Sequence, residues 1–381
     1  MREESMRRKL HNTIQELKGN IRVFSRVRPL LGDELLGMDS DVPQHINFPD
    51  PDKKILELEK LAGITPNEVC ESVASVRRGS NNKYEFQFDR VFPPSSTQTE
   101  VFHEISQLVQ SALDGYNVCI FAYGQTGSGK TFTMEGRGTG DNRGMIPRSV
   151  EKIFATRDDL LSKGWIVSYL VSFLEIYNET IRDLLVQSRS QADSTKHDIK
   201  LVGPNTNEVF VTDLTTVEVQ HQDAVQVLLK RALENRSVAE TKCNERSSRS
   251  HSIFRMKITG SNSVTAESCV GLLNLVDLAG SERLKESGSQ GQRLKETQNI
   301  NKSLANLSNV IMALANKETH VPYRNSKLTH LLQNCLGGSS KMLMFVNVSP
   351  KEECFQETLN SLRFATQVNQ CNIGQAQKKV K

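Results

Sequence analysis

The chain has 381 residues, of which 37% are apolar and 24% are charged, and its formal net charge at pH 7 is +4. That length can bury one large core or two smaller ones, and the small net charge excludes a polycation that binds through its whole surface. The seven scattered cysteines include no Cys-x-x-Cys pair, which argues against a zinc site and for reduced thiols in the cytosol. No apolar run approaches the ~20 residues that span a bilayer, and the N-terminus lacks the apolar segment of a signal peptide. We therefore expect no membrane partner.

The first predicted element is a helix over residues 1–18, which a Gly-Asn pair ends. Four of its side chains recur at alternating four- and three-residue steps: Met6, Leu10, Thr13 and Leu17. This a/d spacing predicts that residues 1–19 are the C-terminal part of a coiled coil. Short isolated helices are marginal in water, which favours the end of a longer coiled coil. A surface helix docked on its own domain is the alternative. Both interpretations remain open from the sequence.

Strand-like and helix-like segments then alternate. Residues 21–26 have the pattern of a strand, 98–115 that of a helix, and the apolar run at 118–123 has the length of a buried strand. The alternation predicts one three-layer α/β domain over residues 20–370, with a central sheet flanked by helices. We expect the short basic tail, 371–381, to be disordered.

A phosphate-binding motif directly follows the apolar run at 118–123. The segment GQTGSGKT fits G-x-x-x-x-G-K-[ST] and lies between a predicted strand and a predicted helix, as the motif requires. Glycines let backbone amides turn toward phosphate oxygens at the start of a helix. Lys130 is expected to neutralise the β- and γ-phosphates, and Thr131 to bind Mg²⁺ through its hydroxyl. The candidate nucleotide-binding residues of this loop are Gly124, Gln125, Thr126, Gly127, Ser128, Gly129, Lys130 and Thr131.

A carboxylate and a glycine end a second apolar strand, in the segment LLNLVDLAGSE. Asp277, at the end of that strand, can hold the water shell of Mg²⁺ beside a phosphate loop. Gly280 can sense a γ-phosphate through its N–H, and its free backbone lets the loop move. Asp-x-x-Gly is a weak signal alone, but together with the phosphate loop it favours a triphosphatase.

A third segment, NERSSRSH at 244–251, combines three serines, two arginines and a histidine. It lies between a helical pattern and an alternating strand. From the residues alone, a serine-rich turn and a functional loop are equally open.

Positive charge is concentrated in residues 283–341, where nine Lys or Arg face three Glu, a local charge of +6. An apolar helical stripe runs through this region: Ile300, Leu304, Leu307, Ile311 and Leu314. Polar residues are expected on the other side of the helix: Lys302, Asn306, Asn309 and Asn316. A solvated helix and a surface that docks on an acidic polymer both fit this pattern. The scarcity of aromatic residues disfavours single-stranded nucleic acid as that polymer.

GQTGSGKT, NERSSRSH and LVDLAGSE, in this order and spacing, closely resemble the phosphate loop and the two switch segments of kinesins. RVRP at 26–29, FLEIYNE at 173–179 and NINKSL at 299–304 extend the resemblance, which covers residues 20–370. It implies the kinesin P-loop NTPase fold, with a mixed, mostly parallel sheet and a short neck helix before it. It also implies an Mg²⁺-dependent ATPase that binds ATP or ADP and moves on microtubules.

The resemblance assigns roles to single residues in the switches. Ser247 would close on the γ-phosphate, and Ser248 would bind Mg²⁺ beside Thr131, with Asp277 acting through water. Arg249 and Glu282 would form a salt bridge between the switches, and Glu282 would relay the proton of the attacking water. The catalytic set that the resemblance implies is Lys130, Ser247, Ser248, Arg249, Gly280 and Glu282.

The resemblance also implies a base pocket and a track-binding surface. The residues expected around the adenine are Arg26, Pro29, Tyr123 and Phe132. Those expected to contact the microtubule are Lys302, Lys317, Arg324 and Lys327.

The candidate coiled coil precedes the domain, as in kinesins with a C-terminal motor. This implies minus-end-directed movement, a homodimer through the upstream coiled coil and a part in spindle organisation. The expected locations are the cytoplasm, the cytoskeleton and the mitotic spindle, with the nucleus open for interphase. No nucleic-acid partner is expected.

Three other functions are alternatives. A regulatory GTPase would read its base with [NT]-K-x-D after a strand, and Thr195-Lys-His-Asp198 fits formally. It lies in a polar loop before a strand-like segment, so we interpret it as a chance match. A non-motile microtubule crosslinker of the same fold and a nucleic-acid-dependent ATPase are the other two.

Overall fold

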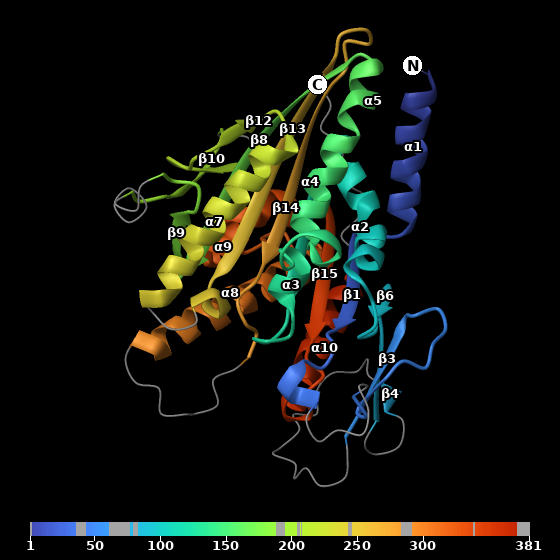
Figure 1. Ribbon diagram of the computed structural model, residues 1–381, viewed down its shortest axis with the longest axis vertical. Helices are drawn as coiled ribbons and strands as arrows, with labels where there is room; N and C mark the ends of the chain where they lie inside the picture. The colour runs from blue at the N-terminus through green and yellow to red at the C-terminus, as the bar shows by residue number, and fades with distance from the viewer. Residues whose placement is uncertain are drawn as a thin grey trace.

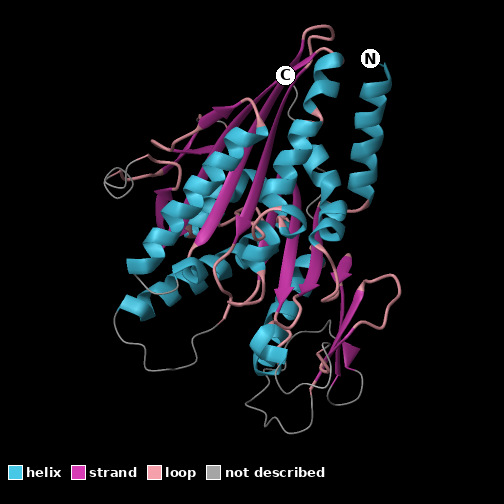
Figure 2. Ribbon diagram, in the orientation of Figure 1, coloured by secondary structure: helices cyan, strands magenta, loops and turns pink. Residues whose placement is uncertain are grey.

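The computed structural model describes residues 2–35, 43–60, 77–78, 83–187, 195–203, 206, 208–242, 246–282, 292–337 and 340–371. A nine-stranded sheet runs through the molecule, and helices cover both of its faces (Figures 1 and 2). Its strands are β1 Ile21–Val27, β6 Arg90–Phe92, β7 Asn117–Tyr123, β8 Trp165–Tyr177, β9 Thr180–Asp183, β12 Val217–Val219, β13 His251–Asn262, β14 Ser268–Asp277 and β15 Ser340–Val348.

The sheet is mixed, with a parallel half and an antiparallel half. The strand order is β12-β8-β13-β14-β7-β15-β1-β6, and β9 pairs with β8. β14, β7, β15, β1 and β6 run parallel to one another, whereas β12, β8, β13 and β14 pair antiparallel with one another, so β14 joins the two halves. Asp277, the last residue of β14, pairs with Ala122 near the end of β7. The chain therefore leaves β7 and β14 at the same edge of the sheet, where α/β proteins bind ligands.

Two helical layers bury the two faces of the sheet in separate apolar clusters. The first layer contains α2 Gln98–Leu113, α3 Lys130–Met134, α4 Met145–Ala155 and α7 Gln222–Lys242. The second contains α8 Gln292–Ala315, α9 Lys327–Leu336 and α10 Phe355–Asn369. The three-layer α/β architecture predicted from the sequence is confirmed.

The central strand β7 shows how the sequence specifies these layers. Val118, Ile120 and Ala122 pack into the first cluster, whereas Cys119 and Phe121 pack into the second. This alternation follows from the period of two in a strand, and both faces of a central parallel strand are buried.

Shorter elements surround the main sheet. They include the short helix α5 Arg157–Ser162, a four-stranded sheet of β2 Ile46–Asn47, β3 Ile55–Glu59, β5 Lys83–Gln87 and β4 Arg77–Arg78, and the hairpin of β10 Ile199–Leu201 with β11 Val209–Val211. The 3₁₀ turns are η1 Gly32–Leu35, η2 Gly140–Asn142, η3 Arg246–Arg249, η4 Tyr323–Asn325 and η5 Glu352–Cys354. The predicted tail beyond residue 371 lies outside the described residues.

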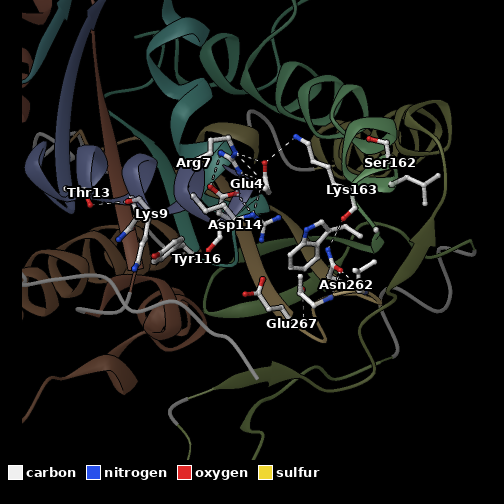
Figure 3. Close-up of a pocket in the computed structure, with 18 residues that line it drawn as sticks. Glu4, Arg7, Lys9, Thr13, Asp114, Tyr116, Ser162, Lys163, Asn262 and Glu267 are labelled. Carbon is white, nitrogen blue, oxygen red and sulfur yellow. Dashed lines mark hydrogen bonds and ion pairs between the residues drawn. The ribbon is translucent and has the colours of Figure 1, made fainter. Parts of the chain in front are cut away.

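The N-terminal helix α1, Arg2–Leu17, docks on the domain through its polar side (Figure 3). The Arg8 guanidinium lies 4.1 Å from the centre of the Trp165 ring, Arg7 pairs with Asp114 at 2.8 Å, and Glu4 accepts from Lys163 at 3.2 Å. The docked surface helix predicted as one alternative is therefore present.

The apolar side of α1 points away from the domain. More than half of the surface of each large apolar side chain along it is exposed: Met6, Leu10, Ile14 and Leu17. The a/d stripe therefore lies on the face of α1 opposite to the docked face. The coiled coil that this stripe predicts is not tested by the docking and stays a prediction. Among the described residues, no helix is both long and apolar enough to cross a membrane.

Candidate nucleotide-binding and catalytic site

The phosphate loop connects β7 to α3 by a turn that its glycines make possible. Gly127 and Gly129 have φ of 77° and 93°, in the region that favours glycine. A Cβ on Gly124 would lie 2.3 Å from the Asn347 carbonyl oxygen, so the loop also passes too close to β15 for any side chain there. No side chain caps the start of α3. The start of α3 is thus left open for an anion, as helix N-termini commonly are.

Lys130 is folded back onto the loop. Its ammonium group is buried and donates to the Gln125 carbonyl at 2.9 Å. Burial lowers its pKa, although the carboxylates of Asp277 and Glu282 act in the opposite direction. A phosphate would offer this cation a stronger, charge-assisted partner than the neutral carbonyl it now has.

The residues expected at the metal form a carboxylate–hydroxyl pair. Thr131 donates from Oγ1 to Asp277 Oδ2 at 2.6 Å. Asp277 is buried, and its Oδ1 has no hydrogen-bond partner among the described residues. Ser248 lies half-buried in η3. Hydroxyl and carboxylate oxygens are the ligands that Mg²⁺ prefers, so an orphaned carboxylate oxygen beside Thr131 fits this ion.

Arg236 is a site residue that the sequence reasoning missed. It lies on α7, is 4% exposed, and places Nη1 3.1 Å from Glu135 Oε1 and 3.6 Å from Asp277 Oδ2. It follows the buried Ala232 by one helical turn, so it belongs to the inner face of an amphipathic helix. An arginine on such a face needs a buried acidic partner, which is the signal that could have found it.

The two switch segments touch each other and the phosphate loop through backbone bonds. The Gly280 amide donates to the Ser248 carbonyl at 2.8 Å, and the Ser281 amide donates to the Gly124 carbonyl at 3.1 Å. Glu282 accepts from the Thr126 amide at 2.8 Å and from the Thr126 hydroxyl at 2.5 Å. The γ-phosphate sensor predicted at Gly280 therefore already has an acceptor in this structure.

The expected salt bridge between Arg249 and Glu282 is not present. Arg249 instead pairs with Glu296 of α8 at 3.3 Å, and Tyr177 donates to the other oxygen of Glu296 at 2.6 Å. The reason is geometric: the Thr126 amide and hydroxyl engage both oxygens of Glu282. The side chain of Ser247 lies outside the described part of the chain.

The expected base pocket is assembled in part. Arg26 is buried, donates to Gln98 and Thr133 at 2.8 and 3.0 Å, and lies 5.5 Å from the Phe132 ring centre. Pro29 is exposed at the end of the segment that follows β1.

Two other residues change this picture. Tyr123 does not join the group, because strand alternation turns it to the opposite face, where its ring centre is 4.7 Å from that of Phe364. Arg28, which the sequence reasoning left out, donates to the Gly127 carbonyl at 2.6 Å and pairs with Glu34 at 2.6 Å. Arg28 thus connects the phosphate loop to the segment that follows β1.

Comparison with known proteins is decisive for the family. The family model of the kinesin motor domain matches residues 26–371. The chain belongs to the kinesin motor-domain family. Carboxy-terminal kinesin 2 of Xenopus laevis is 53% identical over 376 residues, covering 98% of this chain and 56% of that protein. The chain spans about half the length of such curated kinesin relatives.

Solved kinesin structures agree with this assignment and with the predicted fold. The C-terminal motor and motor homology domain of Kar3Vik1, fused to a synthetic heterodimeric coiled coil, aligns with a TM-score of 0.80 and 46% identity over 97% of this chain and 90% of that chain. The motor domain of the Saccharomyces cerevisiae kinesin-related protein Kar3 aligns with a TM-score of 0.74 and 46% identity over 92% of this chain and all of that chain.

The expected track-facing residues of this kinesin lie on the second helical layer and the turn beside it. Lys302, Lys317 and Arg324 are exposed, and Lys327 is half-buried with Nζ 3.3 Å from Asp198. Asn306, expected to face solvent, is instead buried and donates to the Asn325 carbonyl at 3.2 Å. It anchors the segment between α8 and α9, so the outward face of α8 is narrower than predicted.

The segment Thr195–Asp198, which matches the base-reading motif formally, contacts this layer. Besides the Asp198–Lys327 pair, the His197 ring contacts the Thr212 carbonyl at 2.8 Å, next to the β10–β11 hairpin. These contacts give the segment a structural role at the start of α9.

Proposed function

We propose that this kinesin domain is a microtubule-stimulated, Mg²⁺-dependent ATPase motor. One continuous set of contacts carries the proposal. Glu282 holds Thr126 of the phosphate loop, and Gly280, two residues earlier, holds Ser248. Arg249, the next residue after Ser248, holds Glu296 on the helix that bears the candidate track-binding lysine. A ligand that rearranges the first contacts must change the last.

Each residue of the loop would have a defined task with Mg·ATP bound. Lys130 would exchange the Gln125 carbonyl for β- and γ-phosphate oxygens. Thr131, Asp277 and Ser248 would hold the ion, which supplies charge neutralisation and alignment of the phosphates. Arg26, with Phe132 beside it and Pro29 at the rim, would bound the base.

Turnover would require two of the observed bonds to break. The Gly280 amide must leave the Ser248 carbonyl before it can donate to a γ-phosphate. Arg249 must leave Glu296 before it can reach Glu282, which would orient the attacking water and accept its proton. Phosphoryl transfer depends mainly on such positioning, so closure of the switches would limit the rate.

The deciding experiment is the ATPase rate of the chain alone and with microtubules, DNA or RNA, together with GTP in place of ATP. We expect stimulation by microtubules alone and a preference for ATP. Equal rates with and without microtubules would contradict the motor proposal. A gliding assay separates a motor from a non-motile crosslinker, which would bind microtubules but leave them stationary.

The exposed cations on the second layer would bind the acidic track, because opposite charges attract within the ~8 Å screening length at physiological salt. Lys302→Ala and Arg324→Ala should raise the microtubule concentration for half-maximal stimulation, and added salt should do the same. Lys152→Ala is the matched control, since Lys152 lies on α4 in the other layer. An equal effect of the control would count against this surface.

We propose further that the full-length protein forms a homodimer through a coiled coil that includes α1. The support is the exposed apolar stripe on a helix whose other side is docked. Leu10→Asp should convert the dimer to a monomer in sedimentation experiments, whereas Lys9→Asp should not. By family likeness, we also propose minus-end-directed movement and a place on the mitotic spindle and cytoskeleton. Polarity-marked microtubules and cell imaging test these two points, with a nuclear pool in interphase as a separate outcome.

A further inference from the structure

His251 joins the two switches to the track-facing helix through both of its ring nitrogens. The Ala279 amide donates to Nδ1 at 3.0 Å, and Nε2 lies 2.7 Å from the Ser303 hydroxyl. His251 is the first residue of β13, directly after the segment that holds Ser248 and Arg249. Ala279 lies between Asp277 and Gly280, and Ser303 is on α8. One imidazole thus links its own segment to two others, the loop after β14 and α8.

The hydrogen bonds fix the chemical state of this imidazole. Nδ1 accepts the Ala279 N–H, so it carries no proton. Ser303 Oγ lies 2.7 Å from the Ile300 carbonyl and donates its proton to that oxygen. The Ser303 oxygen must therefore accept from His251, and Nε2 carries the proton. His251, Ala279 and Ser303 are at most 3% exposed and Ile300 is 8% exposed, so these hydrogen bonds are buried away from water.

The ring lies where a movement of the loop after β14 can be passed to α8. Gly280, whose amide is bound to Ser248, follows Ala279 directly. A movement that frees the Gly280 amide pulls on the Ala279 amide and hence on Nδ1. The ring is rigid, so Nε2 moves with Nδ1 and carries Ser303. A displacement of α8 by the track would act on the ring in the opposite sense.

We propose that His251 is a positioning residue that couples the nucleotide switches to α8, with Ser303 as its acceptor on the helix. This proposal rests on the proposed function, because the coupling can be measured only if microtubules stimulate the ATPase rate. His251 touches no reacting atom. Its task is to make the loop after β14 and the helix move as one unit.

Three variants separate the hydrogen bond of His251 with Ala279 from its hydrogen bond with Ser303. Ser303→Ala removes the acceptor on the helix without adding volume. In His251→Asn the amide oxygen can replace Nδ1, so the Ala279 bond is kept and the Ser303 bond is lost. In His251→Gln the terminal amide can replace Nε2, so the Ser303 bond is kept. Ser308→Ala, half-buried on the same helix, is the matched control.

The measurement is the ATPase rate against microtubule concentration, with the rate without microtubules and the melting temperature recorded for each variant. Ser303→Ala and His251→Asn should keep the unstimulated rate and lose stimulated kcat by about tenfold, within the usual range of coupling between sites. Their half-maximal microtubule concentration should change little. The double variant should lose no more than either single one, because both remove one contact.

Three outcomes are distinguishable. If the wild-type chain is not stimulated, the proposed function fails and takes the inference with it. If the wild type is stimulated and Ser303→Ala matches Ser308→Ala, the inference alone fails. If both rates fall in proportion to the melting temperature, His251 has a structural role only and the inference is also overturned.

Discussion

Glu282 is bonded to Thr126 and not to Arg249, although the family likeness pairs it with the arginine. Both of its oxygens accept from Thr126, at 2.8 Å from the amide and 2.5 Å from the hydroxyl, while Arg249 pairs with Glu296 at 3.3 Å. Each member of the expected bridge is therefore engaged elsewhere. Forming the bridge exchanges two existing contacts for one new contact, so its cost depends on Thr126 and Glu296 as much as on the bridge itself.

Glu282→Ala should abolish turnover while nucleotide binding persists. The variant loses the group that would accept the proton of the attacking water, and such groups contribute roughly 10²- to 10⁴-fold to rate. Lys130, Thr131 and Asp277 remain to bind the nucleotide. Steady-state ATPase and fluorescent-nucleotide titration test the two halves separately. Normal stimulated ATPase in this variant would contradict the role of Glu282.

Glu296→Gln should raise the unstimulated ATPase rate. The neutral amide holds Arg249 less strongly than the carboxylate does, because charge-assisted hydrogen bonds are roughly twice as strong as neutral ones. A weakening of about 1 kcal/mol would increase the fraction of closed switches about fivefold. Tyr177→Phe, which leaves the Glu296 charge in place, should have a smaller effect in the same direction. A lower unstimulated rate in Glu296→Gln would mean that the Arg249–Glu296 pair assists closure.

Asp277→Asn should weaken nucleotide binding in the presence of Mg²⁺ but not in its absence. The variant removes the charge that faces Thr131 and Arg236, and leaves a buried arginine with one acidic neighbour fewer. We expect a loss of tenfold or more in affinity for Mg·ADP and about 3 kcal/mol in stability. Asp183→Asn is the control, since Asp183 is buried and bonded only to backbone amides in the described structure. It should lower stability without changing the Mg²⁺ dependence.

Motif and strand context were sufficient to predict the glycine turn between β7 and α3 and the place of Asp277 at the end of β14, because short local rules govern both. A glycine-rich turn between a strand and a helix requires no knowledge of distant residues. Arg236 could not be placed in this way, since its partners Glu135 and Asp277 are 101 and 41 residues away along the chain. The Arg249–Glu296 pair could not be predicted for the same reason, since its two residues are far apart along the chain.

Strand periodicity explains one of the remaining differences, and tertiary contacts explain the others. Tyr123 was expected beside the adenine because it precedes the phosphate loop, but the period of two in β7 places it with Phe364 on the other face. Asn306 was expected to face solvent, but the segment after α8 folds back and buries it. In α1, the a/d spacing identified the apolar face of the helix. The docking face could not be found in this way, because it consists of charged residues that do not recur at a regular spacing.

Asp114→Asn should loosen the docking of α1. Asp114 is 1% exposed and pairs with Arg7 at 2.8 Å, and Arg8 lies 3.7 Å from the same oxygen. Loss of this charge should cost the docked state about 2 kcal/mol. Trp165, the single tryptophan of the chain, lies under Arg8 and reports the change. Quenching of its fluorescence by acrylamide should increase in Asp114→Asn and stay unchanged in Glu151→Gln, which alters the pair between Glu151 of α4 and Arg143 before it.

Acid should destabilise the fold through His251. Burial, and then the charges of Lys130 and Arg236, lower its pKa to about 3, whereas an unfolded histidine has a pKa of ~6.5. Between these values the unfolded chain binds a proton that the folded chain does not. The free energy of unfolding must therefore fall as the pH falls, by up to ~1.4 kcal/mol per pH unit from this residue. It is unaffected by this residue above pH ~6.5, where both states are neutral.

His251→Asn isolates that contribution, because asparagine cannot take up the proton. Urea unfolding at several values between pH 6.5 and 5 should show the stability of the wild type falling more steeply than that of the variant. The gap between the two should thus narrow toward acid, even if the variant is less stable at neutral pH. Parallel curves would mean that the folded protein accepts the proton on His251 as readily as the unfolded chain does. The Ala279 amide could not then keep its bond to Nδ1, because a protonated ring has no acceptor there.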